Sequence, residues 1–189
     1  MEQILRGELR PGDRLVELRI AAQMETSQAP VREALRELEA LGLVETLHNR
    51  GARVRIISDA ELREIYDVRA QLEGFAAECA ARTGCDLRAR LEREIRHMRK
   101  AAEAADSRRF SEHNSNFHRI IVRAAENATL TGLWEGLNIK SRTMLNVVRH
   151  PTDLIAVTVS HEPLVDALSG GDAERARRAA IEHVLMHKP

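Results

Sequence analysis

The sequence predicts a mainly α-helical protein with two domains: an N-terminal winged helix-turn-helix with a small β-hairpin wing, and a C-terminal antiparallel bundle of six or seven helices. Three patterns indicate this architecture: two short helical segments around a tight turn, an alternating apolar and charged segment after them, and a long remainder with helical periodicity. The remainder is rich in Ala, Leu, Arg and Glu, whereas glycine and proline punctuate the chain up to residue 56. We therefore expect domains at 1–57 and 58–189.

The composition is that of a globular protein rather than a disordered chain, because 43% of the 189 residues are hydrophobic and 31% are charged. The mean hydropathy is −0.36. No apolar run approaches the ~18 residues of a membrane helix, and the first residues contain no signal-peptide core. Cys79 and Cys85, the only cysteines, match neither a disulfide framework nor a CxxC motif. We expect a cytoplasmic protein with reduced thiols and no membrane partner.

The charge balance does not by itself point to a nucleic-acid partner. Lys and Arg total 29, as do Asp and Glu, so the formal net charge is zero. A case for DNA binding must therefore rest on where the arginines lie. Almost all basic residues are Arg, whose guanidinium suits two-point contacts to phosphate and guanine, although a general bias toward arginine would explain the same count.

The first domain begins with two predicted helices that form a helix-turn-helix. Apolar residues at helical spacing predict a helix over 15–24, and the turn 25–27 follows. Ser27 can cap the next helix, and Pro30 is tolerated there because a first-turn N–H has no helical partner to lose. Gly42 ends this second helix as a C-cap. Its apolar stripe consists of Val31, Ala34, Leu35, Leu38 and Leu41.

A β-hairpin follows the second helix. Residues 43–47 and 52–56 are predicted strands, because the second run alternates apolar and charged residues with a period of two. The tip is His48-Asn49-Arg50-Gly51, in which Gly51 can adopt a positive φ. A helix-turn-helix followed by a hairpin is the pattern of a winged helix.

The second helix of this motif carries the residues expected to read DNA. Arg32 and Arg36 lie four residues apart, away from the apolar stripe, where long donors can reach base edges in the major groove. Ser27 and Gln28 stand at its N-terminal end, where donors suit phosphates. The wing tip can enter the minor groove through His48, Asn49, Arg50 and Gly51. The alternative is that both arginines only pair with neighbouring glutamates on a solvated face, namely Glu33, Glu37 or Glu39.

The remainder of the chain is predicted to form six helices with short connections, which favour antiparallel neighbours. Ser58 and Glu61 fit a capping box that opens the first helix, and Gly84 closes it. The other five are expected at 86–105, 107–126, 128–149, 153–169 and 172–187. The aromatic residues that fall on apolar stripes, and are therefore expected in the core, are Tyr66, Phe75, Phe110, Phe117 and Trp134.

Three histidines and one asparagine of the helical part form a candidate metal site. Asn114 and His118 are four residues apart on one predicted helix, so both face the same side. His161 and His183 flank the Gly170-Gly171 turn, which can fold the last two helices against each other. Three imidazoles and an amide oxygen suit Zn²⁺, Ni²⁺ or a similar divalent ion. Spacing alone does not establish that these side chains converge, and scattered histidines on helices are more often surface or core-edge residues.

Residues Ile4 to Val54 resemble the winged-helix domain of the GntR family of bacterial transcription regulators. The motifs that carry the resemblance are Gly7 to Leu15, Pro30 to Arg36, Leu38-Glu39, Gly42 to Val44 and Asn49 to Ala52. The resemblance implies that Arg32, Arg36 and the wing residues contact operator DNA. The chain departs from the family at Gln28, where Arg is usual, and in a short predicted first helix from Glu2 to Gly7.

Residues 61–187 resemble the FCD ligand-binding domain of the FadR-like subgroup of that family. The matching residues are Tyr66 to Arg69, Leu72-Glu73, Asn114 to His118, Asn127, His161, Ala167, Asp172, Ala176 and His183. The resemblance implies that a divalent metal is bound by Asn114, His118, His161 and His183, with Asn114 replacing the commoner Asp. His187 ranks below these four as a ligand.

The same resemblance implies a small carboxylic-acid effector at or beside the metal. Arg69 is then expected in the pocket wall, and Arg142 is a second candidate counter-ion for the carboxylate. The alternative for each arginine is a structural salt bridge, such as that of Arg69 with Glu73 one helical turn away.

The sequence thus predicts an effector-responsive transcription repressor, not an enzyme, that binds double-stranded operator DNA as a homodimer. One alternative is a metal-responsive regulator in which the ion itself is the effector. A metal-dependent hydrolase is a further alternative, but the chain has no HExxH motif and no evident general base beside the histidines.

Overall fold

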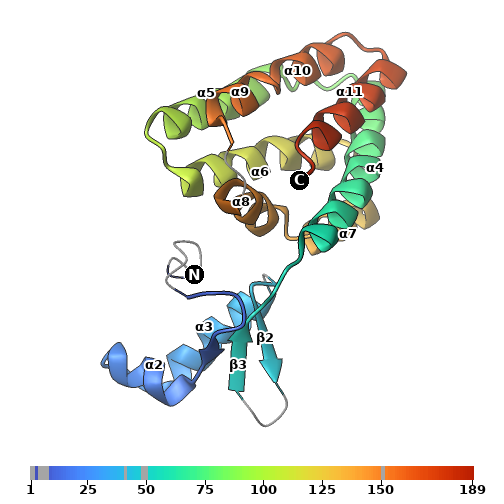
Figure 1. The fold of residues 1–189 in the computed structure, drawn as a ribbon. Coiled ribbons are helices and arrows are strands. Elements are labelled where there is room, and N and C mark those ends of the chain that lie inside the picture. Colours follow the sequence, from blue (N-terminus) through green and yellow to red (C-terminus); the bar gives the residue numbers. More distant parts are fainter. Residues whose placement is uncertain (1–2, 4–8, 41, 48–50, 150–151) are drawn as a thin grey trace. The chain divides into compact units, whose positions relative to one another are not determined.

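A computed structural model describes residues 3, 9–40, 42–47, 51–149 and 152–189 of the protein. The chain divides into two compact units, Met1–Ser58 and Asp59–Pro189, and each is described by itself (Figure 1). Several predicted features lie outside the described residues, namely Leu41 of the apolar stripe, the wing-tip residues His48, Asn49 and Arg50, and nearly all of the first helix predicted at 2–7. Among the helices that are described, none is long and apolar enough to traverse a lipid bilayer.

The N-terminal unit is the predicted helix-turn-helix and hairpin, with a third short strand in front. Its elements are β1 (Arg14–Leu15), α2 (Glu17–Gln23), α3 (Gln28–Ala40), β2 (Val44–Leu47) and β3 (Gly51–Val54). The antiparallel sheet has the order β1-β3-β2, with Val44 opposite Val54 and Leu47 opposite Gly51. Gly51 adopts a φ of +80°, as the predicted turn requires.

Leu15 corrects the start of the first predicted helix. This residue belongs to β1, where it pairs with Ala52 and is buried with Val44 and Val54, so that α2 begins only at Glu17. Leu18, another apolar residue of the segment 15–24, is 65% exposed. The helical spacing of apolar residues was misleading here, because the partner strand of Leu15 lies far along the chain.

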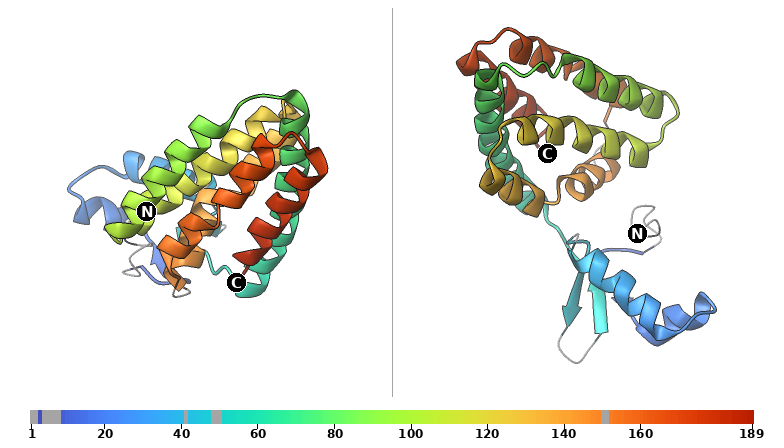
Figure 2. Two further views of the ribbon diagram at one scale, coloured as in Figure 1. Left: turned by 90° about the horizontal axis from the view of Figure 1, so that it is seen from above. Right: turned by 180° about the vertical axis from the view of Figure 1, so that it is seen from behind.

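The C-terminal unit contains eight helices within the described residues, instead of the six or seven predicted. They are α4 (Asp59–Thr83), α5 (Arg88–Glu103), α6 (Ser107–Ala124), α7 (Ala128–Gly136), α8 (Ile139–Arg149), α9 (Leu154–Val159), α10 (Glu162–Ser169) and α11 (Ala173–Met186). Figures 1 and 2 show α4 beside α11 and α5 beside α6, in agreement with the contacts between these pairs.

Two of the predicted helices are each broken into two. The helix predicted at 128–149 is interrupted by Asn138, whose φ of +52° is left-handed and ends α7 before α8 begins. The helix predicted at 153–169 is interrupted between α9 and α10, where Pro163 lacks the N–H that a continuous helix would need. The second break leaves His161 at the junction between α9 and α10.

The core of this unit gathers around α6. Phe110 and Phe117 of α6, Trp134 of α7 and Tyr66 of α4 are fully buried, as predicted. Phe75 is 41% exposed, so its assignment to the core was wrong. It lies two positions after the buried Glu73 on α4, and two positions turn a helical side chain to nearly the opposite face.

Candidate functional site

Three buried imidazoles converge inside the C-terminal unit. His118 lies on α6, His161 at the junction of α9 and α10, and His183 on α11. Their candidate ligand atoms all lie within 4.8 Å of one another. The ring centroids of His161 and His183 are 4.2 Å apart, and each is within 5.5 Å of the His118 centroid. The fold therefore unites histidines that the sequence spreads over three segments.

Each of these imidazoles uses its Nδ1 atom to donate a hydrogen bond to an oxygen outside the cluster. His161 Nδ1 is 2.8 Å from the Val157 carbonyl oxygen, and His183 Nδ1 is 3.1 Å from that of Ser160. His118 Nδ1 is 2.7 Å from Glu73 Oε2. Because these oxygens can only accept, a neutral imidazole must carry its proton on Nδ1 and leave a lone pair on Nε2.

Burial favours this neutral state. It lowers the pKa of His118 and, together with the nearby imidazoles, places the pKa values of His161 and His183 well below the usual histidine range. Neutral imidazoles with free Nε2 lone pairs are the form that binds a metal ion.

Asn114 adds an oxygen to the cluster from one turn earlier on α6. Its Oδ1 is 3.0 Å from His161 Nε2. As placed, these are two acceptors facing each other, an arrangement that is stable when a cation contacts both or when the Asn114 amide turns over to donate. His118 Nε2 is buried without a hydrogen-bond partner. Three imidazole nitrogens and one amide oxygen are ligands of the kind that a late first-row divalent cation takes.

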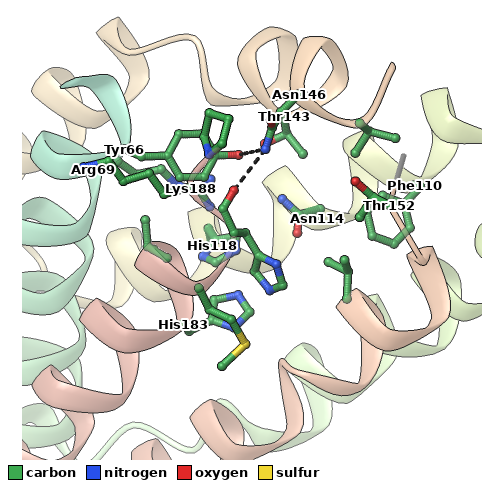
Figure 3. A pocket seen from close by; sticks show the side chains of 16 residues that line it. Tyr66, Arg69, Phe110, Asn114, His118, Thr143, Asn146, Thr152, His183 and Lys188 are labelled. Atoms are coloured by element: carbon green, nitrogen blue, oxygen red, sulfur yellow. Dashed lines mark hydrogen bonds between the residues drawn. The ribbon is translucent and has the colours of Figure 1, made fainter. Parts of the chain in front are cut away.

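A cavity of about 200 Å³ lies against this cluster (Figure 3). Asn114, His118 and His183 lie on its wall, and Tyr66, Arg69, Thr143, Asn146 and Lys188 are further polar residues of its lining. The apolar part of the wall includes Phe110, Val147, Val157 and Val184. A space of this size, with polar groups along an apolar wall, suits a small polar ligand.

Two residues of α8 contribute polar groups to this cavity that sequence reasoning missed. Asn146 Nδ2 donates to Tyr66 Oη at 3.2 Å and to the His187 carbonyl oxygen at 3.0 Å, which leaves Oδ1 buried without a partner. Thr143 Oγ1 is also buried without a hydrogen-bond partner. The signal in the sequence was only the three-residue spacing of Thr143 and Asn146, which places both on one face of a helix that carries several other polar residues.

The two candidate effector-binding arginines have different surroundings. Arg69 lines the cavity, but its Nε donates to Glu73 Oε1 at 2.7 Å, which is the salt bridge that the sequence offered as the alternative. Arg142 is not among the described residues that line the cavity; its Nη1 lies 3.9 Å from Glu61 Oε1. His187 also belongs to the wall, with Nε2 2.8 Å from Ser160 Oγ, and burial lowers its pKa to about 4.

The arginines of α3 point away from the core of the N-terminal unit. Arg36 is exposed and its Nη1 is 3.6 Å from Glu33 Oε2, one of the partners that the sequence offered as an alternative. Arg32 instead forms two hydrogen bonds to Glu17 Oε2 across the helix pair, from Nε at 3.0 Å and Nη2 at 2.8 Å. Ser27 and Gln28 are exposed at the start of α3.

A winged helix with exposed arginines on its second helix, linked to a helical unit whose cavity is lined by buried histidines, belongs to the class of DNA-binding transcription regulators. The chain is a member of the GntR family: the family described as "Bacterial regulatory proteins, gntR family" matches residues 1–54, and the FCD domain matches residues 64–185. The predicted family and fold class are thus confirmed.

Curated relatives are also named as transcription regulators. A "Probable D-xylose utilization operon transcriptional repressor" of Paenarthrobacter nicotinovorans is 41% identical over 187 residues, covering 99% of this chain and 83% of that protein. A "Gluconate operon transcriptional repressor" of Bacillus licheniformis is 32% identical over 136 residues, covering 71% of this chain and 56% of that protein. Members of this family are transcription regulators and generally not enzymes.

Solved structures share the fold. McbR/YncC of E. coli superposes with a TM-score of 0.76 at 24% identity, covering 97% of this chain and 89% of that one. A GntR regulator from Rhodococcus sp. RHA1 gives a TM-score of 0.75 at 22% identity, covering 97% and 88% of the two chains. At these identities the likeness concerns the fold alone.

Proposed function

We propose that this regulator is a cytoplasmic operator-binding repressor whose DNA affinity is controlled by a small carboxylic acid bound at a divalent metal ion. His118, His161, His183 and Asn114 hold the ion, which serves as a positive anchor for the acid. The observation that carries this proposal is the orientation of the three imidazoles, each with Nδ1 donating outward and Nε2 left for the cluster.

The charges around the cluster favour an anionic effector. The proposed ligands, three neutral imidazoles and one amide, leave a bound divalent ion with its full charge. Glu73 is the carboxylate that contacts this cluster, but Arg69 pairs with it at 2.7 Å and balances its charge. A buried, uncompensated double charge is costly, so a carboxylate that enters the cavity and binds the ion gains both coordination and charge neutralisation.

The polar groups of α8 favour an acid that also carries hydroxyl groups. Asn146 Oδ1 is an acceptor and needs a donor, which a bare carboxylate does not supply. Two curated relatives are named for a D-xylose utilization operon and a gluconate operon. Sugar acids such as D-xylonate and D-gluconate combine the required carboxylate and hydroxyl groups, whereas D-xylose lacks the carboxylate.

The DNA-reading surface is proposed on α3 and the wing. Arg32 and Arg36 contact base edges in the major groove, Ser27 and Gln28 contact phosphates, and the wing from His48 to Gly51 enters the minor groove. A single winged helix contacts few bases, so a homodimer that binds two half-sites is expected. The effector then changes the placement of the two reading units and lowers operator affinity.

Fluorescence anisotropy with DNA selected by the protein from a random-sequence pool tests this proposal. Metal-loaded protein should bind the selected DNA tightly, and D-xylonate or D-gluconate should weaken binding by roughly 5- to 150-fold, while D-xylose should not. Protein treated with a chelator should lose this response to the acids.

Two other results would replace the proposal. A change of DNA affinity on metal addition alone, with no effect of any acid, would make the ion itself the effector. Turnover of small acyl substrates by metal-loaded protein would favour a hydrolase.

A further inference from the structure

We propose that Glu73 is a positioning residue that fixes the tautomer of His118 and so keeps His118 Nε2 available as a ligand. The inference rests on the metal site proposed above. It concerns a residue of α4 that supplies no atom to the ion itself.

Glu73 is a buried carboxylate that receives three hydrogen bonds from three different helices. Its Oε1 accepts from Arg69 Nε on α4 at 2.7 Å and from Trp134 Nε1 on α7 at 2.7 Å. Its Oε2 accepts from His118 Nδ1 on α6 at 2.7 Å. The Glu73 side chain is 4% exposed, so water does not compete for these bonds.

The two donors on Oε1 determine which way the carboxylate faces. A guanidinium N–H and an indole N–H can only donate, so the position of Oε1 must be filled by an acceptor. Because Oε1 is held in this way, Oε2 is directed at His118 Nδ1 and requires a proton there. His118 must then keep its Nε2 lone pair, and this atom is buried without a partner. A carboxylate that orients a ligating histidine is a recurrent support of metal sites.

Replacing Glu73 with glutamine tests the proposal directly. In Glu73→Gln, the amide oxygen must take the place of Oε1, because Arg69 and Trp134 both donate to it. The amide NH₂ then faces His118 Nδ1, which has to accept. The His118 proton moves to Nε2, and this nitrogen can no longer bind a cation. Glutamine is nearly isosteric with glutamate, so the change affects the tautomer more than the packing.

The proton positions can be measured in metal-free full-length protein by two-bond ¹H–¹⁵N correlation spectra of ¹⁵N-histidine-labelled samples. His118 is assigned as the signal set that is lost in His118→Gln. We expect protonated Nδ1 in the wild type and protonated Nε2 in Glu73→Gln. Glu94→Gln is the matched control, since Glu94 is a buried carboxylate bonded to His113 Nδ1 at 2.9 Å, and it should leave His118 unchanged. An unaltered His118 tautomer in Glu73→Gln would overturn the proposal.

Metal affinity gives a second readout. In competition with a chelator, Zn²⁺ should bind Glu73→Gln about 10- to 100-fold more weakly than the wild type, and Glu94→Gln equally well. If Glu73→Gln does not fold because the Arg69 charge is left unpaired, the double variant Arg69→Met/Glu73→Gln removes that charge and should show the same loss. If folded Glu73 variants bound Zn²⁺ as tightly as the wild type, the positioning role of Glu73 would be refuted, but the metal site would not. A wild type that binds no Zn²⁺ would instead refute the metal site, while the tautomer measurement would still stand.

Discussion

Arg32 of α3 reaches across the helix pair to Glu17 of α2, and its Nη2 lies 2.8 Å from Glu17 Oε2. The arginine proposed to read DNA is therefore already held by an acid in the free protein. The hydrogen bond from Arg32 lowers the pKa of Glu17, so the pair stays charged at neutral pH. Both side chains are at the surface, where water screens such a pair and makes it easy to exchange for a DNA contact.

The first prediction tests whether Arg32 contacts DNA or only links α3 to α2 through Glu17. Arg32→Ala should weaken specific operator binding by about 5- to 150-fold, the range expected for loss of a two-point base contact, and Arg36→Ala should do the same. Glu17→Gln breaks the same ion pair but keeps the guanidinium, so it should bind the operator at least as tightly as the wild type. Anisotropy titrations at one salt concentration measure all three. If Glu17→Gln lost affinity as Arg32→Ala does, Arg32 would act as a brace between helices.

The second prediction concerns metal content. His161→Ala should reduce the metal that copurifies with the protein, because it removes one of the three Nε2 donors. Asn114→Asp should raise affinity for Zn²⁺, since an added negative charge at the ligand strengthens binding and a carboxylate has no amide to turn over.

Elemental analysis and chelator competition check this prediction. His97→Ala is the control, because His97 stacks on His113 at a centroid distance of 4.6 Å, away from the cluster. Unchanged metal stoichiometry in His161→Ala would reject the ligand role of His161.

The third prediction is a loss of stability in acid. The native pKa values of His118, His161 and His183 lie below the ordinary value of 6.5 because these residues are buried. Well above pH 6.5 the histidines are neutral in both the folded and the unfolded protein. Below it the unfolded chain takes up protons that the folded protein excludes. The free energy of unfolding should therefore fall by up to about 1.4 kcal/mol per pH unit for each histidine.

Urea denaturation of metal-free protein between pH 7.5 and 5.5 measures this slope. His183→Gln, which cannot titrate at that position, should show a shallower fall. Identical slopes for the two proteins would show that His183 does not contribute.

The fourth prediction concerns the packing of α4 against α11. A Cβ atom on Gly74 would lie 2.6 Å from Cγ1 of Ile181, so Gly74→Ala should destabilise the protein by roughly 1–3 kcal/mol. Gly132 in α7 has no atom within 4 Å of its would-be Cβ. Gly132→Ala should therefore raise the free energy of unfolding by about 0.5–1 kcal/mol through helix propensity. Chemical denaturation measures the free energy of unfolding of both variants. Equal changes in the two would contradict the close approach of Ile181 to Gly74.

Local sequence patterns predicted most of the fold. Turn chemistry at Gly42 and Gly51 and the apolar stripe of α3 indicated the winged helix, and the breaks at Gly84 and Gly171 coincide with observed positive-φ turns. The predictions were wrong where a residue pairs with one far along the chain, or where a helix ends without a glycine or proline to mark its end. Leu15 joined a strand because of Ala52, and Asn138 ended a helix without a glycine or proline beside it.

The site was predictable in its residue types but not in its hydrogen bonding. Histidine and asparagine positions pointed to metal chemistry, and the three imidazoles do lie together. The partners of their Nδ1 atoms come from backbone carbonyls and from Glu73 on another helix, and no spacing rule reveals these. Glu73 matches the FCD pattern and is the i+4 partner of Arg69 in the sequence, but its bonds to His118 and Trp134 depend on tertiary packing.

The absent side chain of Gly74 also limits how the helical unit can respond to a ligand. Because Ile181 fills the space beside Gly74, α11 packs directly against α4 there and cannot approach it more closely. Only residues 55–58 separate α4 from the last strand of the wing. Under the proposed function, an acid that displaces His183 would therefore press α11 against α4, the helix that follows the wing in the chain.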